Sequence, residues 1–407
     1  MNDHKYEVLS PAGDLECLKA AVSFGADAVY LAGTQFGMRT ASKNFTKEQL
    51  AEGIEFAHSR GARVHITCNV LPRSSELDAL PEFLHTAQAL GADAFIIADL
   101  GVLELAKKHA PNVEIHASTQ TGIVNYATAN ALHKMGVSRV VLARELSIPE
   151  IREIRRNTSP ELEIETFVHG SMCVSFSGRC LISSYMTGRD ANRGDCAQPC
   201  RWKYHLYEEN RDGQFFPVEE DESGTYLYNS RDLCMIEHLP ELLEAGVKSL
   251  KIEGRAKSAY YTSVVTNAYS GAVRAYEACP DNYTLPQWAL EEVDKVSHRE
   301  YNTGFFFGTE PGQQTGFGGY IRKYDVVAVC ERGSDGCECE ITQRNKFYVG
   351  DELDVLPPGQ PSYTVHVLSI RNETGEQVES TPHAMERLWL TADKPVPGGA
   401  FLRKKKN

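Results

Sequence analysis

The sequence predicts a closed α/β barrel of the TIM type, followed by a small antiparallel β-barrel, and two observations carry this prediction. First, a helical stretch that ends at Gly or Pro is followed within a few residues by a short β-branched run, and this joint occurs seven times. Second, short alternating strands replace this pattern near the C-terminus. Strands that alternate with helices indicate a parallel sheet covered by those helices.

The joints predict eight parallel strands, of which the first begins at Tyr6. The other seven begin at Ala28, Val64, Ala94, Val113, Val140, Ile164 and Leu250. The segments between them, such as 46–60 and 76–90, place apolar residues three and four positions apart, as expected of helices that cover a sheet. Eight βα units favour a closed barrel, although the same alternation also fits an open doubly wound sheet.

The spacing of the joints predicts an insertion after the seventh strand, over residues 170–235. Successive joints lie 20 to 36 residues apart up to Pro160, whereas the next one, at Gly246, lies 86 residues further on. In barrels the loops that follow the strands build the active-site face. The insertion therefore lies where chemistry is expected.

Three regions are predicted along the chain. Residues 1–280 form the barrel with its insertion, residues 281–319 form a connector rich in Gly and aromatic residues, and residues 320–407 form the small β-barrel from six short strands. The final run from Arg403 to Lys406 is typical of a solvated tail.

Composition sets limits on the function. Hydrophobic residues make up 42% and charged residues 24% of the 407 residues, which is ordinary for a globular protein. No leader pattern or membrane-length apolar run occurs, so we expect a cytoplasmic protein without a membrane partner whose eleven cysteines stay reduced. A net charge of -13 argues against nonspecific coating of nucleic acid, so any RNA contact is expected to be local.

Four cysteines crowd the insertion. Cys173, Cys180, Cys196 and Cys200 lie within 28 positions and are separated by six, fifteen and three residues. Zinc sites usually show two close pairs, whereas iron-sulfur sites tolerate more varied gaps. Spacing alone favours a cluster and leaves zinc and incidental thiols open, and Cys234 could replace one ligand.

The insertion also carries a local excess of three positive charges. Five cations face two acids, namely Arg179, Arg189, Arg193, Arg201 and Lys203 against Asp190 and Asp195. A second basic group surrounds Glu253 at the end of the eighth strand and consists of Lys248, Lys251, Arg255 and Lys257. Barrels often bind an anionic ligand there, although a solvated helix start has the same composition.

Other polar residues are candidates because they are predicted at strand ends. They are Asn69, Asp99, Ser118, Gln120, Arg144 and His169. A histidine beside a metal loop is more often a packing residue or a supporting group than a catalyst. The chain has no HExxH, P-loop or nucleophile-elbow motif, which argues against the standard hydrolases.

A longer signature runs from Glu165 to Ser183 and reads Glu-x-Phe-x-x-Gly-Ser-Met-Cys-x4-Gly-x-Cys-x-Ile-Ser. In this run the chain resembles the collagenase-like peptidase family U32. The resemblance extends across the barrel through Leu9-Ser-Pro-Ala-Gly-Asp14, Asn192-Arg-Gly-Asp-Cys-Ala-Gln-Pro-Cys200, Asn229-Ser-Arg-Asp-Leu-Cys234 and Lys251-Ile-Glu-Gly-Arg255.

The resemblance implies a function that composition and spacing do not. Several branches of the family are implicated in oxygen-independent hydroxylation with a 4Fe-4S cluster, and its RNA branches depend on prephenate as co-substrate. The branch with a short β-rich C-terminal domain, which this chain is similar to, makes 5-hydroxyuridine at the wobble position of tRNA. The implied partners are the tRNA anticodon loop, prephenate and a paralogous member of the family.

Carried over by motif, the cluster ligands are Cys173, Cys180, Cys196 and Cys200, with Cys234 as the rival fourth ligand because another branch uses a later cysteine. The resemblance leaves the catalytic residues open. His169, Lys251 and Arg255 are the candidate catalytic residues because of their predicted positions at strand ends. Tyr185 and Trp202 are the candidates for stacking on the target base. A peptidase, as the family name says, and a 23S rRNA cytidine hydroxylase are the alternatives.

Overall fold

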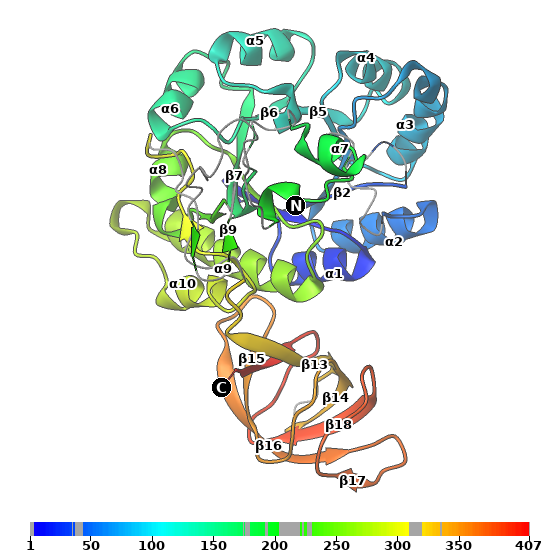
Figure 1. The fold of residues 1–407 in the computed structure, drawn as a ribbon, viewed down its shortest axis with the longest axis vertical. Coiled ribbons are helices and arrows are strands. Elements are labelled where there is room, and N and C mark those ends of the chain that lie inside the picture. The colour runs from blue at the N-terminus through cyan, green and yellow to red at the C-terminus, as the bar shows by residue number, and fades with distance from the viewer. Residues whose placement is uncertain are drawn as a thin grey trace, which may run out of the picture.

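The computed structural model describes residues 4–34, 36, 44–173, 175, 180–191, 194–202, 220–221, 224–225, 230–308, 320–333 and 336–406. Figure 1 shows a ring of helices around a central sheet, with a separate small β-barrel beside it. No helix in these ranges is long and apolar enough to cross a membrane.

The eight predicted barrel strands are present. They are β1 (Glu7–Pro11), β2 (Ala28–Leu31), β3 (Arg63–Cys68), β4 (Ala94–Ile97), β5 (Glu114–Ala117), β6 (Arg139–Val141), β7 (Glu163–Ser171) and β11 (Ser249–Ile252). Each pairs in parallel with the next, and β11 pairs with both β1 and β7. Ser249 on β11 lies opposite Glu7 on one side and Glu165 on the other, which closes the barrel and excludes the open sheet.

Helices cover the outside of this barrel (Figure 1). They are α1 (Leu15–Ser23), α2 (Lys47–His58), α3 (Leu80–Ala89), α4 (Leu100–His109), α5 (Tyr126–Lys134), α6 (Ile148–Arg156), α8 (Leu239–Glu244) and α9 (Ala259–Ala278). Asp99, a candidate by position, has a structural role, because its carboxylate accepts the Val102 N–H and caps α4. Outward strand residues such as Val8, Ile66 and Ile164 pack fully buried against the helices.

Two short strands extend the sheet outside the barrel. β10 (Asp232–Cys234) runs antiparallel to the end of β7, and β12 (Tyr301–Asn302) pairs with β10. Between α9 and β12 lies α10 (Gln287–Val293), whose Val293 is buried in the barrel core. The described part of the predicted connector thus packs against the barrel. A 2.6 Å ion pair between the buried Arg299 of the connector and the buried Asp232 of β10 stabilises this contact.

The C-terminal domain is the predicted antiparallel β-barrel. Its six strands are β13 (Tyr324–Arg332), β14 (Glu338–Gln343), β15 (Glu352–Leu356), β16 (Tyr363–Arg371), β18 (Arg387–Ala392) and β19 (Phe401–Lys405), and β17 (Gln377–Val378) adds a hairpin. They pair in the order β15-β19-β13-β14-β18-β16, and β15 closes the ring on β16.

The expected solvated tail is wrong at Arg403. This residue lies in β19, is fully buried, and its Nη2 atom pairs with Glu292 at 2.7 Å and with Asp354 at 3.0 Å. Glu292 belongs to α10 and Asp354 to β15, so one guanidinium joins the two domains. The Phe401 ring packs against Phe24 of the barrel at 5.9 Å between centroids.

Candidate functional site

A buried ionic network occupies the barrel interior. The Arg139 guanidinium on β6 donates to Glu7 at 2.5 Å, to Glu163 at 2.6 Å and to Glu165 at 3.2 Å. Glu165 in turn accepts from the Lys251 Nζ atom at 2.7 Å. The network therefore runs from the amino ends of the strands, at Arg139 and Glu163, toward their carboxyl ends, at Lys251.

The network keeps the Glu7 carboxylate ionised despite its burial. Burial by itself raises the pKa of Glu7, but the Arg139 guanidinium outweighs it and holds this pKa well below its ordinary value. Ser249 also donates to Glu7 at 2.7 Å. The Lys251 ammonium lies over the Tyr30 ring, 4.5 Å from its centroid, just below the barrel mouth.

Two histidines share this interior without charge. His65 on β3 and His116 on β5 are fully buried, with ring centroids 4.8 Å apart. Burial lowers the pKa of each well below 6.5, and the Arg139 guanidinium lowers it further. Both ring nitrogens of His65 lack a hydrogen-bond partner among the described residues. Both rings are therefore neutral at physiological pH.

Cations gather at the carboxyl ends of the strands, where barrels carry their active sites. Arg144 follows β6; its guanidinium lies 4.0 Å from the Phe167 ring centroid, donates to the Ser171 carbonyl at 3.0 Å and lies 3.6 Å from Glu253. The buried Arg255, which follows β11, donates to Thr67 at 3.3 Å and to Asn44 at 3.1 Å. We call Arg144, Lys251 and Arg255 the mouth cations.

Lys251 and Arg255, two of the predicted catalytic candidates, therefore lie at the mouth. The other two members of the basic group predicted around Glu253, Lys248 and Lys257, lie outside the mouth. Lys248 precedes β11 at the opposite end of the barrel and donates to the Lys5 carbonyl, and Lys257 lies over the Tyr261 and Tyr320 rings. Of the other candidates by position, Ser118 caps a short 3-10 turn by accepting the Gln120 N–H.

Two glycines of the sequence signature allow the mouth to close tightly. A Cβ on Gly13 would lie 2.2 Å from the Arg255 carbonyl oxygen. A Cβ on Gly170 would lie 2.4 Å from the Glu253 carbonyl oxygen, and the φ of Gly170 is 108°. Only glycine fits positions where the backbones approach so closely. The loops that carry Arg255 and Glu253 are thereby held against β1 and β7.

The cysteine-rich insertion begins directly at this mouth. Cys173 follows β7 by two residues. Burial raises the pKa of its thiol, the Ser175 backbone and Arg144 lower it, and nearby Cys180 and Cys196 raise it again. Arg144 donates to the carbonyl of Ser171, two residues before Cys173, so this cation lies beside the start of the insertion. None of the four predicted ligands, all of which are described, is paired in a disulfide.

The local backbone directs an N–H group toward one of these thiols. Gln198 has a φ of 57°, which is unusual for a residue other than glycine, and its N–H donates to the Cys196 sulfur at 3.3 Å. Ser183 in α7 (Ile182–Thr187) accepts the Ala197 N–H at 3.0 Å and anchors the same turn. Within the described residues, no three Cys, His, Asp or Glu side chains are already arranged to hold a metal ion.

Cys234 lies in a different environment. It belongs to β10, and its sulfur contacts the Tyr269 hydroxyl at 3.9 Å on the outer side of β7. Burial raises the pKa of this thiol to about 11.

His169 also lies outside the mouth. Its ring packs among Tyr261, Tyr269 and Tyr301, with centroid distances of 6.1, 5.5 and 5.2 Å. Burial lowers the pKa of His169 to about 3, which keeps the ring neutral at physiological pH. The position expected from the sequence, a strand end beside the cysteine loop, is present, but the ring points away from the mouth.

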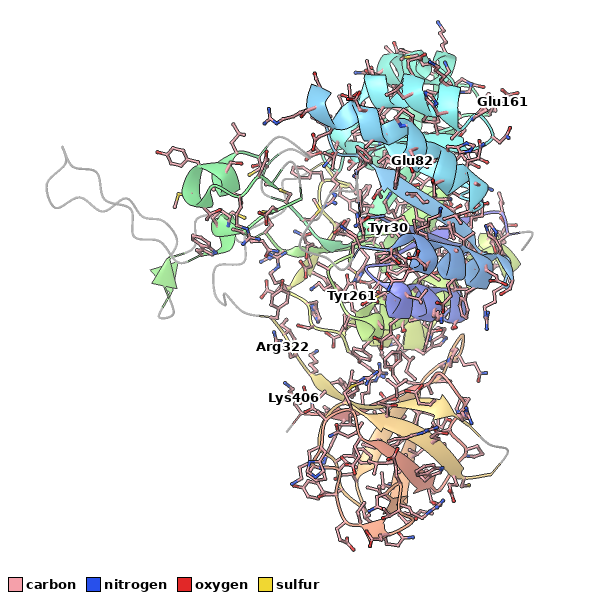
Figure 2. All side chains as sticks on the ribbon, turned by 90° about the vertical axis from the view of Figure 1, so that its right-hand side faces the viewer. Tyr30, Glu82, Glu161, Tyr261, Arg322 and Lys406 are labelled. Atoms are coloured by element: carbon pink, nitrogen blue, oxygen red, sulfur yellow. The ribbon has the colours of Figure 1, made fainter. Side chains whose placement is uncertain are left out.

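The insertion exposes large apolar side chains. Tyr185 in α7 is 90% exposed, and Leu181, Met186 and Trp202 are also exposed. α7 lies over the barrel in Figure 1, and its green helix stands out from one side of the barrel in Figure 2. A second short pair, β8 (Glu220–Asp221) and β9 (Gly224–Thr225), belongs to the same insertion.

The sequence-based prediction missed several residues of the site. Arg139, Glu165, Tyr30 and Thr67 were not singled out, although charged residues inside otherwise apolar strands were a visible signal at Arg139 and Glu165. Asn44 reaches Arg255 from a distant segment, and no local pattern indicates that contact.

Comparison with known proteins shows which protein family the chain matches. Residues 13–316 match the model of peptidase family U32, and residues 322–403 match that of the U32 C-terminal domain. The tRNA hydroxylation protein P1 of Bacillus subtilis is 38% identical over 99% of this chain and 95% of its own length. An uncharacterized protease of Methanocaldococcus jannaschii, MJ0090, is 44% identical over 74% of this chain and 73% of its own length. The 23S rRNA 5-hydroxycytidine C2501 synthase of Escherichia coli is 39% identical over 96% of this chain and 57% of its own length.

The buried histidines predict a loss of stability in mild acid. The unfolded chain takes up protons near pH 6.5, but folded His65 and His116 do not, so each lowers the free energy of unfolding by about 1.4 kcal/mol per pH unit below that point. Urea unfolding of the barrel at pH 6.5 and pH 5 measures this slope. His65→Gln should make the slope shallower, whereas the control His85→Gln, at an exposed position on α3, should not. Equal slopes for wild type and His65→Gln would contradict the account.

Proposed function

The chain belongs to peptidase family U32, and from this membership we propose that it hydroxylates tRNA, converting the wobble uridine to 5-hydroxyuridine. The observation that carries the proposal is the arrangement of the mouth. Cys173 follows the end of β7, Arg144 donates to the carbonyl of the last residue of this strand, Ser171, and the other two mouth cations come from β11 and the loop after it. An anion, a metal cluster and a base from an RNA loop could meet there.

We place the reaction in the cytoplasm, where tRNA is modified.

The cofactor in this proposal is a 4Fe-4S cluster. Its ligands would be Cys173, Cys180, Cys196 and Cys200, which lie on the insertion and are not paired in disulfides. The Gln198 N–H that donates to the Cys196 sulfur is the kind of bond that stabilises cluster thiolates. When bound, the cluster would supply electron transfer or a Lewis-acidic iron. The partly buried Cys234 thiol contacts the Tyr269 hydroxyl instead, which favours Cys200 as the fourth ligand.

Prephenate is the proposed co-substrate and source of the hydroxyl oxygen. It is a dianion, and the mouth cations Arg144, Lys251 and Arg255 are the groups expected to bind it. Glu165 holds the Lys251 ammonium in place, and the Phe167 ring supports the Arg144 guanidinium. These cations would position the anion; none of them is required to transfer a proton.

The tRNA anticodon loop would reach the mouth from the side of the insertion. A base in a single-stranded loop can turn outward and stack on an aromatic side chain. Tyr185 and Trp202 are exposed and lie on the same insertion as the cysteines, so they are the candidates for this stacking. A paralogous family member remains a candidate protein partner.

The peptidase alternative lacks a matching site. His65 and His116 are fully buried and His169 is enclosed by tyrosines, so none of the three can act as a base for an exposed nucleophile at the mouth. The rRNA alternative is weaker for another reason. This chain covers 57% of the rRNA enzyme's length but 95% of the length of the Bacillus tRNA protein.

Iron analysis of the anaerobically purified protein tests the ligand set. Wild type should hold about four iron atoms and show visible cluster absorption. Cys200→Ser should lose both, whereas Cys234→Ser should keep them because its thiol lies against Tyr269. The reverse result would move the fourth ligand to Cys234, and zinc without iron in the wild type would refute the cluster.

Deletion of the gene tests the substrate. Mass spectrometry of bulk tRNA should show that 5-hydroxyuridine is lost in a strain that lacks other family members, and that the wild-type gene restores it. Arg144→Met should lower the restored level by roughly 10- to 100-fold, because a charge-assisted contact of about 1.5 to 3 kcal/mol is removed. Lys257→Met, which changes a cation outside the mouth, is the control. Unchanged 5-hydroxyuridine in the deletion strain would overturn the proposal, and loss of 23S rRNA hydroxycytidine instead would favour the alternative.

A further inference from the structure

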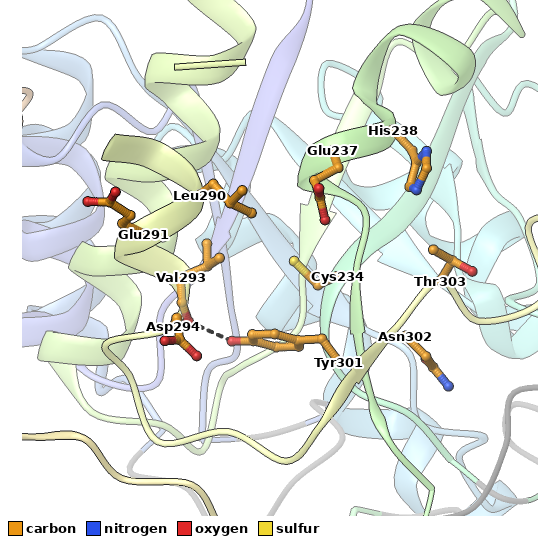
Figure 3. A pocket seen from close by; sticks show the side chains of 10 residues that line it. All are labelled: Cys234, Glu237, His238, Leu290, Glu291, Val293, Asp294, Tyr301, Asn302 and Thr303. Atoms are coloured by element: carbon orange, nitrogen blue, oxygen red, sulfur yellow. Dashed lines mark hydrogen bonds between the residues drawn. The ribbon is translucent and has the colours of Figure 1, made fainter. Parts of the chain in front are cut away.

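A cavity of about 440 Å³ lies outside the barrel, on the far side of β7 from the mouth cations. Figure 3 shows that it opens between β10 with its following turn on one side and α10 on the other. Its size falls within the range that encloses small organic ligands. Neither the proposed cluster nor the proposed RNA contact uses this space.

One wall of the cavity is apolar and another is a fixed aromatic ring. Leu290 and Val293 project from α10 toward the cavity (Figure 3). The Tyr301 hydroxyl donates to the Val293 carbonyl at 2.7 Å, and its ring stacks on His298 at 4.1 Å with an interplanar angle of 4°. Because the hydroxyl group and one face of the ring both have a partner, the Tyr301 side chain is fixed before a ligand binds.

The charge on the lining is negative. Glu237, Glu291 and Asp294 line the cavity, and its ten lining residues include no lysine or arginine. The Glu237 carboxylate points into the space in Figure 3, and no described lysine or arginine pairs with it. Asp294 pairs with the Lys323 ammonium and lies 3.2 Å from the His298 Nε2 atom.

The floor of the cavity is the Cys234 thiol, whose sulfur points toward the space between Glu237 and Val293 (Figure 3). The lining therefore combines three carboxylates, of which Asp294 pairs with Lys323, with an aromatic ring and an apolar wall.

We propose that this cavity binds a small organic ammonium, a primary amine on a short apolar body. The ammonium lies against the Glu237 carboxylate and the Tyr301 ring, where ion pairing and cation–π attraction act together. The apolar body packs on Leu290 and Val293. This site is independent of the proposed hydroxylation, since none of its residues lies at the mouth.

Calorimetry on the full-length protein with 2-phenylethylamine as the probe tests the proposal. Its neutral analogue 2-phenylethanol has nearly the same shape and should bind at least about tenfold more weakly, because it lacks the charge. Glu237 is exposed to solvent, which screens its ion pair, so Glu237→Gln should weaken amine binding by roughly two- to fivefold. The matched control Glu244→Gln removes the same charge from an exposed position on the neighbouring α8 and should leave binding unchanged.

Alkylation of cysteines locates the bound amine. With the probe present, N-ethylmaleimide should label Cys234 several-fold more slowly, while labelling of the exposed Cys279 at the end of α9 stays unchanged. Peptide mass spectrometry follows both sites in one sample. Equal affinities for amine and alcohol, unchanged binding by Glu237→Gln, or unprotected Cys234 would each overturn the proposal.

Discussion

The ionic network from Glu163 through Arg139 and Glu165 to Lys251 is the interaction on which the rest of the barrel depends. Charges buried this deeply are tolerated only as partners, and removing one partner typically costs about 3 to 5 kcal/mol. Arg139 satisfies three carboxylates at once, from β1 and from two positions of β7. The network thus links β6, β7, β1 and β11, and the last three of these strands meet where the barrel closes.

The same network determines the electrostatics of the mouth. Glu165 holds the Lys251 ammonium over the Tyr30 ring, so one mouth cation is anchored by the buried network. The other two are fixed from the side, Arg144 by the Phe167 ring and Arg255 by Thr67. An acidic protein therefore presents a preorganised basic centre at one end of its barrel, beside the cysteine-rich insertion. An anionic co-substrate requires such a centre, and preorganisation limits the cost of binding it.

Periodic features of the fold were predictable from the sequence, whereas features that depend on long-range contacts were not. All eight barrel strands and the six C-terminal strands follow from apolar periodicity and turn residues. The orientation of His169 depends on β10 and on three tyrosines from α9 and β12, which no local pattern places there. Arg403 looked like part of a solvated tail because its partners, Glu292 and Asp354, are distant in sequence. The cysteines could be grouped by spacing, but only the structure separates Cys234 from Cys173.

In the proposed function, the mouth and the cysteine-rich insertion together form the RNA-modifying centre. Photo-crosslinking with tRNA that carries 4-thiouridine at the wobble position tests this most directly, because the label reacts only with residues that touch the base. Peptide mass spectrometry should find the crosslinks on the insertion, at Tyr185 or Trp202, or on residues of the barrel mouth. Crosslinks confined to the C-terminal barrel or to the outer helices would contradict the account.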